Sequence, residues 1–165
     1  MKAGIDVYMT EGTAIAAKAE TYRLKLWKHG GIDDIKNPWY MSEIIGTFRI
    51  KPFMTHHDAT EPVGYFIESR TTGERLLFVT DSYYIDYRFK GLTHIMVEAN
   101  FCADSLADAE NDPRRFRLRR SHMSLENCIK LLKANNLSQC REIWLIHLSS
   151  SNGDAEGFKR AVQEA

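Results

Sequence analysis

Hydrophobic positions along the chain follow two periods, and these predict strands interspersed with helices. Compact or alternating apolar runs predict strands at residues 5–9, 46–53, 63–68, 75–80, 94–99 and 141–148. Apolar residues at helical spacing predict helices at residues 14–19, 125–135 and 154–164. A turn at residues 71–74 joins two of the strands as a hairpin. Strands that alternate with helices and also form hairpins favour an α/β fold, with mixed β-sheet layers covered by helices.

The composition is typical of a single soluble domain. The chain has 165 residues, of which 44% are apolar and 27% charged, and nothing divides it, so we treat residues 1–165 as one domain. No apolar run approaches the ~20 residues that cross a bilayer, and the N-terminal segment lacks the apolar stretch of a signal peptide. We therefore expect a cytoplasmic protein without membrane contact. The three cysteines form no C-x-x-C pair, which argues against a disulfide framework or a thiolate zinc site.

Three side chains of the metal-ligand type stand at the ends of predicted strands. His57 follows the second strand, Asp81 follows the fourth, and His147 lies near the end of the last. Strand ends are where α/β sheets assemble their sites, and imidazole with carboxylate suits zinc or another borderline first-row ion. Structural, hydrogen-bonded histidines are the alternative at such positions, and spacing alone does not decide between the two.

Five segments share their order along the chain with motifs of a known enzyme fold. They are residues 53–65 (containing H-D-A-x-x-P-V-G-Y), 77–84 (T-D-S-Y-Y), 97–101 (V-E-A-N-F), 121–126 (S-H-M-S-L-E) and 144–149 (W-L-I-H-L-S). Together they resemble the metallo-β-lactamase fold, specifically its bacterial and phage exonuclease-like and ribonuclease Z-like branch. Tyr83 stands where the second motif usually has glycine.

The resemblance implies roles for four residues. His57, Asp81 and His147 would be metal ligands, with Asp81 able to bridge two ions, and His122 would lie over the metal as a proton donor. A histidine that caps or packs before the helix at residues 125–135 is the structural alternative for His122. His56 and His57 are neighbours and point to opposite faces of a strand, so they are not expected to share one ion.

One motif of that family is missing from the sequence. The H-x-H-x-D-H loop, which supplies most of the first zinc site in the family, occurs nowhere in the chain, and neither does the family's final strand. We therefore expect a truncated, partial metallo-β-lactamase-like fold of phage or mobile-element origin. Its three ligands would hold one Zn²⁺ rather than two, so two-metal catalysis is not expected.

An arginine-rich segment follows Pro113. Five arginines lie within residues 114–120: Arg114, Arg115, Arg117, Arg119 and Arg120. The chain as a whole is neutral, with 22 basic and 22 acidic residues, so this is a local basic patch. It could contact the phosphates of a nucleic acid or an acidic protein surface. A solvated helix face is the alternative.

Two functions from different classes follow. We favour a catalytically degenerate, zinc-bearing protein that binds a macromolecular partner, for example a phage inhibitor of host defence such as an anti-CRISPR protein that binds a CRISPR effector nuclease. The alternative is a metal-dependent nuclease or phosphodiesterase whose site is incomplete or is completed by a homodimer. A fragment of a longer hydrolase is the third interpretation.

Overall fold

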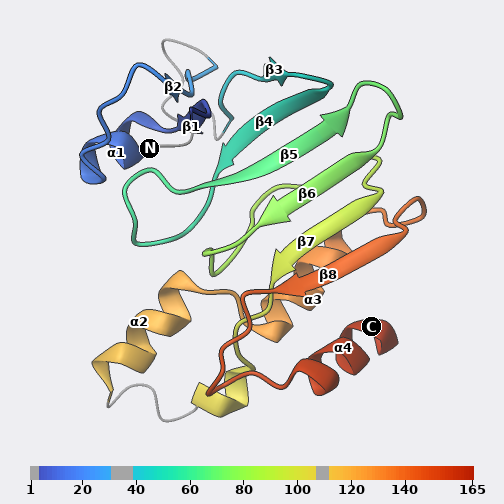
Figure 1. Ribbon diagram of the computed structural model, residues 1–165. Coiled ribbons are helices and arrows are strands. Elements are labelled where there is room, and N and C mark those ends of the chain that lie inside the picture. The colour runs from blue at the N-terminus through green and yellow to red at the C-terminus, as the bar shows by residue number, and fades with distance from the viewer. Residues whose placement is uncertain (1–3, 31–38, 107–111) are drawn as a thin grey trace.

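The computed structural model describes residues 4–30, 39–106 and 112–165. Six strands form the main sheet in the order β3-β4-β5-β6-β7-β8, and two more form a small parallel sheet (Figure 1). The small sheet pairs β1 (Val7–Met9) with β2 (Leu24–Leu26) around α1 (Glu11–Ala16). The strands of the main sheet are β3 (Glu43–Ile45), β4 (Phe48–Met54), β5 (Val63–Ser69), β6 (Arg75–Val79), β7 (His94–Glu98) and β8 (Glu142–Ile146).

The main sheet is mixed. Strands β3 to β6 pair antiparallel, whereas β6, β7 and β8 run parallel. As a result β4, β6, β7 and β8 all end at the same edge of the sheet, as their arrowheads in Figure 1 show. The segments that follow these four strands are therefore neighbours, although they lie far apart in the sequence.

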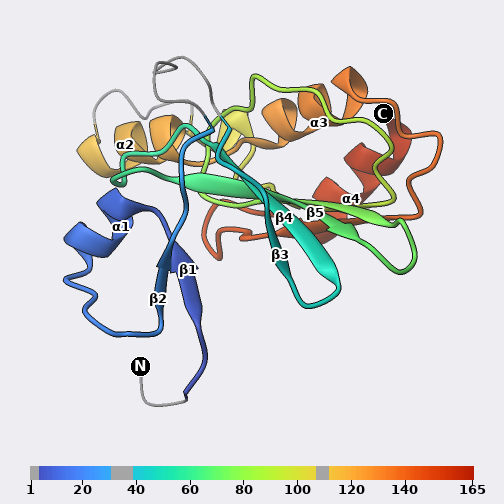
Figure 2. The same cartoon turned by 90° about the horizontal axis from the view of Figure 1, so that it is seen from above.

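Helices cover one face of this sheet (Figure 2). They are α2 (Pro113–Ser121), α3 (Leu125–Ala134) and α4 (Ala155–Glu164), with a short 3₁₀ helix at Ala103–Leu106. The core lies between this face and the helices, where Leu77 and Val97 of the sheet meet Leu131 of α3 and Phe158 of α4. This confirms the predicted α/β class with a mixed sheet and covering helices.

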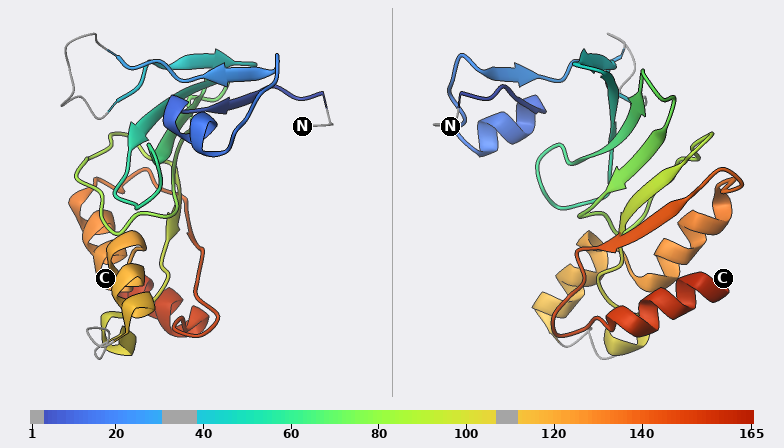
Figure 3. Two further views of the ribbon diagram at one scale, coloured as in Figure 1. Left: turned by 90° about the vertical axis from the view of Figure 1, so that its left-hand side faces the viewer. Right: turned by 45° about the vertical axis from the view of Figure 1, so that its right-hand side comes forward.

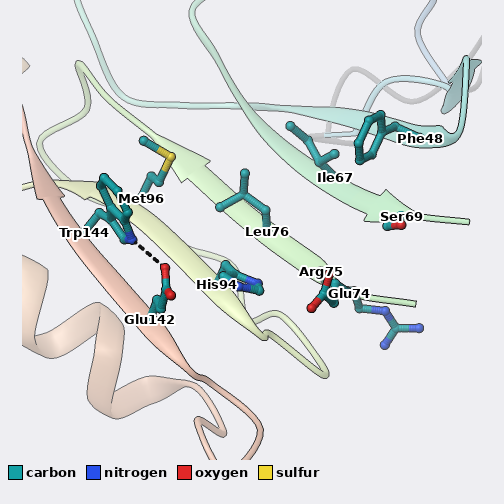
Figure 4. Close-up of a pocket in the computed structure, with 10 residues that line it drawn as sticks. All are labelled: Phe48, Ile67, Ser69, Glu74, Arg75, Leu76, His94, Met96, Glu142 and Trp144. Carbon is teal, nitrogen blue, oxygen red and sulfur yellow. Dashed lines mark hydrogen bonds between the residues drawn. The ribbon is translucent and has the colours of Figure 1, made fainter. Parts of the chain in front are cut away.

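The opposite face of the sheet is covered only in part. The β1–β2 unit lies over part of it (Figure 3). The ring of Trp27, which directly follows β2, lies 6.2 Å from that of Tyr65 in β5. Beyond this contact, Figure 4 shows a row of side chains that stand on the open face along β4 to β8. Trp144 is 57% exposed and Phe48 is 47% exposed there, and they line a groove of about 290 Å³. We call this surface the open face.

Most predicted elements occur close to their expected positions. The hairpin of β5 and β6, the helix capped by Ser124 and the final helix are all present. Strands β2 and β3 and the 3₁₀ helix were not predicted. Nor was α2 assigned beyond the possibility of a solvated helix, although Asp112 as N-cap and Pro113 in the first turn are clear start signals. Of the helices described, none is long and apolar enough to span a membrane.

Candidate metal centre

Side chains of the metal-ligand type gather at the sheet edge where β4, β6, β7 and β8 end. Asp81, Glu98, His122 and His147 each offer a ligand atom, and these atoms all lie within 4.8 Å of one another. Glu98 is the last residue of β7, Asp81 follows β6 and His147 follows β8. His122 comes from the segment between α2 and α3. The topology thus brings together residues as far apart in the sequence as Asp81 and His147.

Asp81 lies at the centre of the cluster. Its Oδ1 is 3.5 Å from His147 Nδ1, 3.7 Å from His122 Nδ1 and 4.0 Å from His57 Nε2. The Asp81 side chain is 43% exposed, so one side of this carboxylate faces an opening. The other two predicted ligands, His57 and His147, and the predicted proton donor, His122, therefore surround the Asp81 carboxylate.

His57 and His56 point to different places. The His57 side chain is 14% exposed, and its ring lies 5.5 Å from that of His122. His56 instead pairs with Asp86 and contacts the ring of Tyr83. The structure thus places His57, and not its neighbour, beside the cluster.

Glu98 is the residue of the site that sequence reasoning missed. Its side chain is fully buried, and it accepts hydrogen bonds from the backbone N–H groups of Ser82 and Met123. His122 donates its Nδ1–H to Glu98 Oε1 at 2.6 Å, and His147 Nδ1 lies 2.9 Å from the same oxygen. A buried carboxylate is stable only when it is paired in this way. The signal available in the sequence was an acidic residue at the end of an otherwise apolar strand.

Glu98 also changes the protonation of His122. The hydrogen bond from His122 to Glu98 raises the pKa of the imidazole above its ordinary value, and the nearby charges of Glu98 and Asp81 add to this effect, while burial opposes it. The charged form of this imidazole is therefore more stable than that of a free imidazole, and in that form Nδ1–H is bound to Glu98 and Nε2 carries a second N–H. Such a group is suited to donate a proton.

Two residues of the cluster have a left-handed backbone. Asp81 has φ +52° and His147 has φ +56°, and residues other than glycine rarely adopt this region. Both residues follow the ends of parallel strands: Asp81 lies two residues beyond β6 and His147 one residue beyond β8. Such conformations concentrate at functional sites, where the surrounding structure holds them in place.

The arginines of α2 lie beside this cluster. A cavity of about 410 Å³ is lined by His57 and Tyr83 on one side and by Phe116, Arg117 and Arg120 on the other. Arg117 forms an ion pair with Asp58, with 3.2 Å between Nη2 and Oδ1, and this pair lowers the pKa of the Asp58 carboxyl. The guanidinium of Arg120 lies over the Phe116 ring at 5.6 Å. The structure therefore places part of the predicted basic patch next to His57.

The comparisons with known proteins bear on the fold. The structure is similar to the crystal structure of the metallo-β-lactamase fold protein YhfI from Bacillus subtilis, with a TM-score of 0.64 at 15% sequence identity. The chain has a metallo-β-lactamase fold. The match covers 95% of this chain but 56% of YhfI, so the chain spans little more than half the length of that protein. No family model matches the sequence, and no curated protein does.

The donor set fits a metal ion. Imidazole nitrogens with carboxylate oxygens are the ligands that zinc and neighbouring first-row ions take in proteins. The cluster couples its ligand-type residues to a buried hydrogen-bonding partner, Glu98, which holds the rings of His122 and His147 in place. Such outer partners are a regular feature of metal sites.

Proposed function

We propose that this chain carries a metal-dependent centre that hydrolyses phosphodiesters. The observation that carries the proposal is the meeting, at one sheet edge, of the ligand-type side chains of His57, Asp81 and His147 with the hydrogen-bonded pair of Glu98 and His122, in which Glu98 is fully buried. His122, whose pKa is raised by its hydrogen bond to Glu98, can serve as the proton donor beside these ligands. The metallo-β-lactamase fold supports the proposal by analogy.

Each residue has a distinct part in this proposal. His57, Asp81 and His147 hold one ion, for which Zn²⁺ suits the donors best. When bound, the ion supplies a polarised water and Lewis-acid stabilisation of the phosphoryl oxygens. Glu98 orients two imidazoles, and His122 delivers a proton from Nε2 to the leaving oxygen.

The basic patch favours an anionic substrate. Arg120 and Phe116 line the cavity that His57 also lines, so a phosphate that enters this cavity lies beside the cluster. A guanidinium with an exposed aromatic ring binds the phosphates and bases of single-stranded nucleic acid. We therefore propose nucleic acid as the substrate class.

A second candidate is a metal-bearing protein that binds an anionic partner without cleaving it. It is favoured by the ligand count, because the described residues supply ligands for one ion, whereas two-metal hydrolysis needs a second set. A second copy of the chain could supply such a set. An inhibitory role against host defence has no support from the fold or the comparison, and the proposal does not include it.

Cleavage assays separate the two candidates. The purified protein is incubated with Zn²⁺ or Mn²⁺ and with a nitrophenyl phosphodiester or a labelled single-stranded oligonucleotide. We expect metal-dependent cleavage that falls at least about a hundredfold in Asp81→Asn and His57→Ala, because each change removes a ligand. His94→Ala is the matched control, since His94 lies on the open face and lines neither the cluster nor the cavity beside α2.

The outcomes differ for each candidate. Cleavage that persists in Asp81→Asn would come from a contaminating nuclease and would contradict the proposal. Metal binding without cleavage, together with oligonucleotide binding that Arg120→Glu weakens, would support the second candidate instead.

A further inference from the structure

Asn100 lies outside the donor cluster but is bonded to two of its segments. It follows β7, is 5% exposed, and stands between the ends of β6 and β8. Its side-chain Nδ2–H donates to the carbonyl oxygen of His147 at 2.7 Å. The residue that receives this bond is the one with φ +56°.

The backbone of Asn100 adds further bonds in the same region. Its N–H donates to the carbonyl of Met123 at 2.9 Å, and its own carbonyl accepts from the N–H of Ser149 at 2.9 Å. Met123 follows His122 and Ser149 lies two residues after His147. One buried residue thus ties together the segments that carry both histidines.

The side chain of Asn100 is only half satisfied. Its Oδ1 is buried without a hydrogen-bond partner among the described residues, whereas its Nδ2 bonds His147. A buried amide that leaves one polar atom unpaired costs stability. In return, its Nδ2 bonds the His147 carbonyl and holds a left-handed backbone conformation that is uncommon for residues other than glycine.

We propose that Asn100 is a positioning residue that holds His147 in its left-handed conformation and so directs the imidazole toward Asp81 and Glu98. The consequence for metal affinity rests on the proposed metal centre, but the positioning itself does not. Among the described residues, the side chain of Asn100 bonds the backbone carbonyl of His147 and no imidazole ring, and Asn100 does not line the cavity beside α2. It therefore acts through the backbone of His147.

Gly153 reaches the same region from the other side. A Cβ on Gly153 would lie 2.7 Å from the carbonyl oxygen of Ser149 and 3.3 Å from that of Asn100. Both are backbone atoms that cannot rotate away. Gly153→Ala should therefore displace the segment from His147 to Ser149 without removing any bonding group of Asn100.

The first test measures the histidine ring signals of the metal-free protein by NMR. Long-range ¹H–¹⁵N spectra in EDTA resolve the ring nitrogens of each histidine. We expect Asn100→Ala, Asn100→Asp and Gly153→Ala to shift the ring signals of His147 while leaving those of His56 and His94 in place. Asn152→Ala is the matched control, because Asn152 bonds Ser149 Oγ in the same loop and has no bond to His147.

The second test measures affinity for Co²⁺, whose absorption spectrum reports ligand geometry. The dissociation constant should rise about tenfold or more in the Asn100 variants, with an altered spectrum, and stay close to that of the wild-type protein in Asn152→Ala. A positioning role is overturned if His147 signals and Co²⁺ affinity both match the wild-type protein, or if Asn152→Ala has equal effects.

The two tests separate this inference from the proposed function. If the wild-type protein binds no Co²⁺, the proposed metal centre fails, while the ring signals of His147 still decide the role of Asn100. If Asn100→Ala does not fold, both measurements are made on Gly153→Ala instead.

Discussion

Glu98 shows how a single residue can organise a site without being recognisable from the sequence. Its carboxylate is fully buried, bonds two backbone N–H groups, and lies within 2.9 Å of the imidazoles of both His122 and His147. Removing it would leave both rings without their shared partner. The charge on His122 therefore depends on a residue 24 positions away in the sequence.

Glu98→Gln should change the pH dependence of stability. The pKa of His122 is raised in the folded state, so its charged form stabilises the fold fully below the unfolded pKa of about 6.5. That contribution is lost as the pH rises through the folded pKa. We expect Glu98→Gln to lower the pKa of His122. The variant should also be less stable than the wild-type protein at low pH, and this difference in unfolding free energy should become smaller as the pH increases.

Histidine NMR titrations and urea unfolding in EDTA between pH 5.5 and pH 9, roughly one unit below and well above the usual histidine range, measure both effects. Glu142→Gln is the control, because Glu142 contacts Trp144 and not His122. An unchanged His122 pKa in Glu98→Gln would contradict this account of the pair.

The three cysteines should differ in reactivity. All three are free thiols, but Cys128 is buried whereas Cys102 and Cys140 are half-buried. Burial, with a smaller contribution from the charge of Glu98, raises the pKa of Cys128 to about 12. Iodoacetamide at pH 8 should therefore spare Cys128 until the protein unfolds. Mass spectrometry of the labelled protein checks this, and rapid native labelling of Cys128 would contradict it.

Among the helices and strands, the sequence predicted those that have a long hydrophobic pattern or a recognisable helix cap. Residues 63–68 and 94–99 were predicted as strands because they are apolar runs bounded by turn residues, and β5 and β7 occupy nearly these positions. Strands β2 and β3 have three residues each, as β1 does, but of these three strands only β1 is followed directly by a helix N-cap, Thr10, which helped to mark it. These short strands form because they pair with other strands, and the local sequence pattern does not indicate such pairing.

The residues of the candidate site likewise fall into those that the sequence predicted and those that it did not. The resemblance to a known family pointed to His57, Asp81, His122 and His147, and the structure brings all four together. Glu98 and Asn100 could not be assigned, because their roles depend on neighbours that the fold supplies. The roles of the four residues as ligands and proton donor stay predictions.

Gly64 in β5 tests the packing of the sheet against its core. A Cβ at this position would lie 2.6 Å from Cζ of Phe53, a fully buried ring, and 3.1 Å from the carbonyl oxygen of Phe78. We expect Gly64→Ala to destabilise the fold by about 1–3 kcal/mol through overpacking. Urea denaturation measures this free energy.

A double-mutant cycle identifies the cause. In a Phe53→Leu background the ring is gone, so Gly64→Ala should cost less than in the wild-type protein. Equal costs in the two backgrounds would show that the contact with Phe53 is not the source of the loss.

At the scale of the whole molecule, the sheet has one covered face and one open face. Helices α3 and α4 bury the first, whereas Phe48, Met96 and Trp144 stand on the second (Figure 4). Domains usually bury both faces of such a sheet, because apolar surface in water is unfavourable. The homodimer stays a prediction, since the chain is described alone.

The open face should bind a hydrophobic dye. We expect the folded protein to enhance the fluorescence of anilinonaphthalene sulfonate, and Trp144→Ser with Phe48→Ser to reduce that signal by at least about half. Ile15→Ser is the control, because Ile15 is 71% exposed on α1, outside the groove. A signal that the double variant leaves unchanged would place the dye elsewhere.

The metal content of the purified protein tests the central claim most directly. After dialysis against Zn²⁺ and removal of free ion, elemental analysis should find about one ion per chain, because the residues that the structure describes form one set of ligands. Asp81→Asn and His147→Ala should lose most of it, and His56→Ala should retain it. A wild-type protein that holds no zinc, or an Asp81→Asn variant that holds as much as the wild type, would contradict the account.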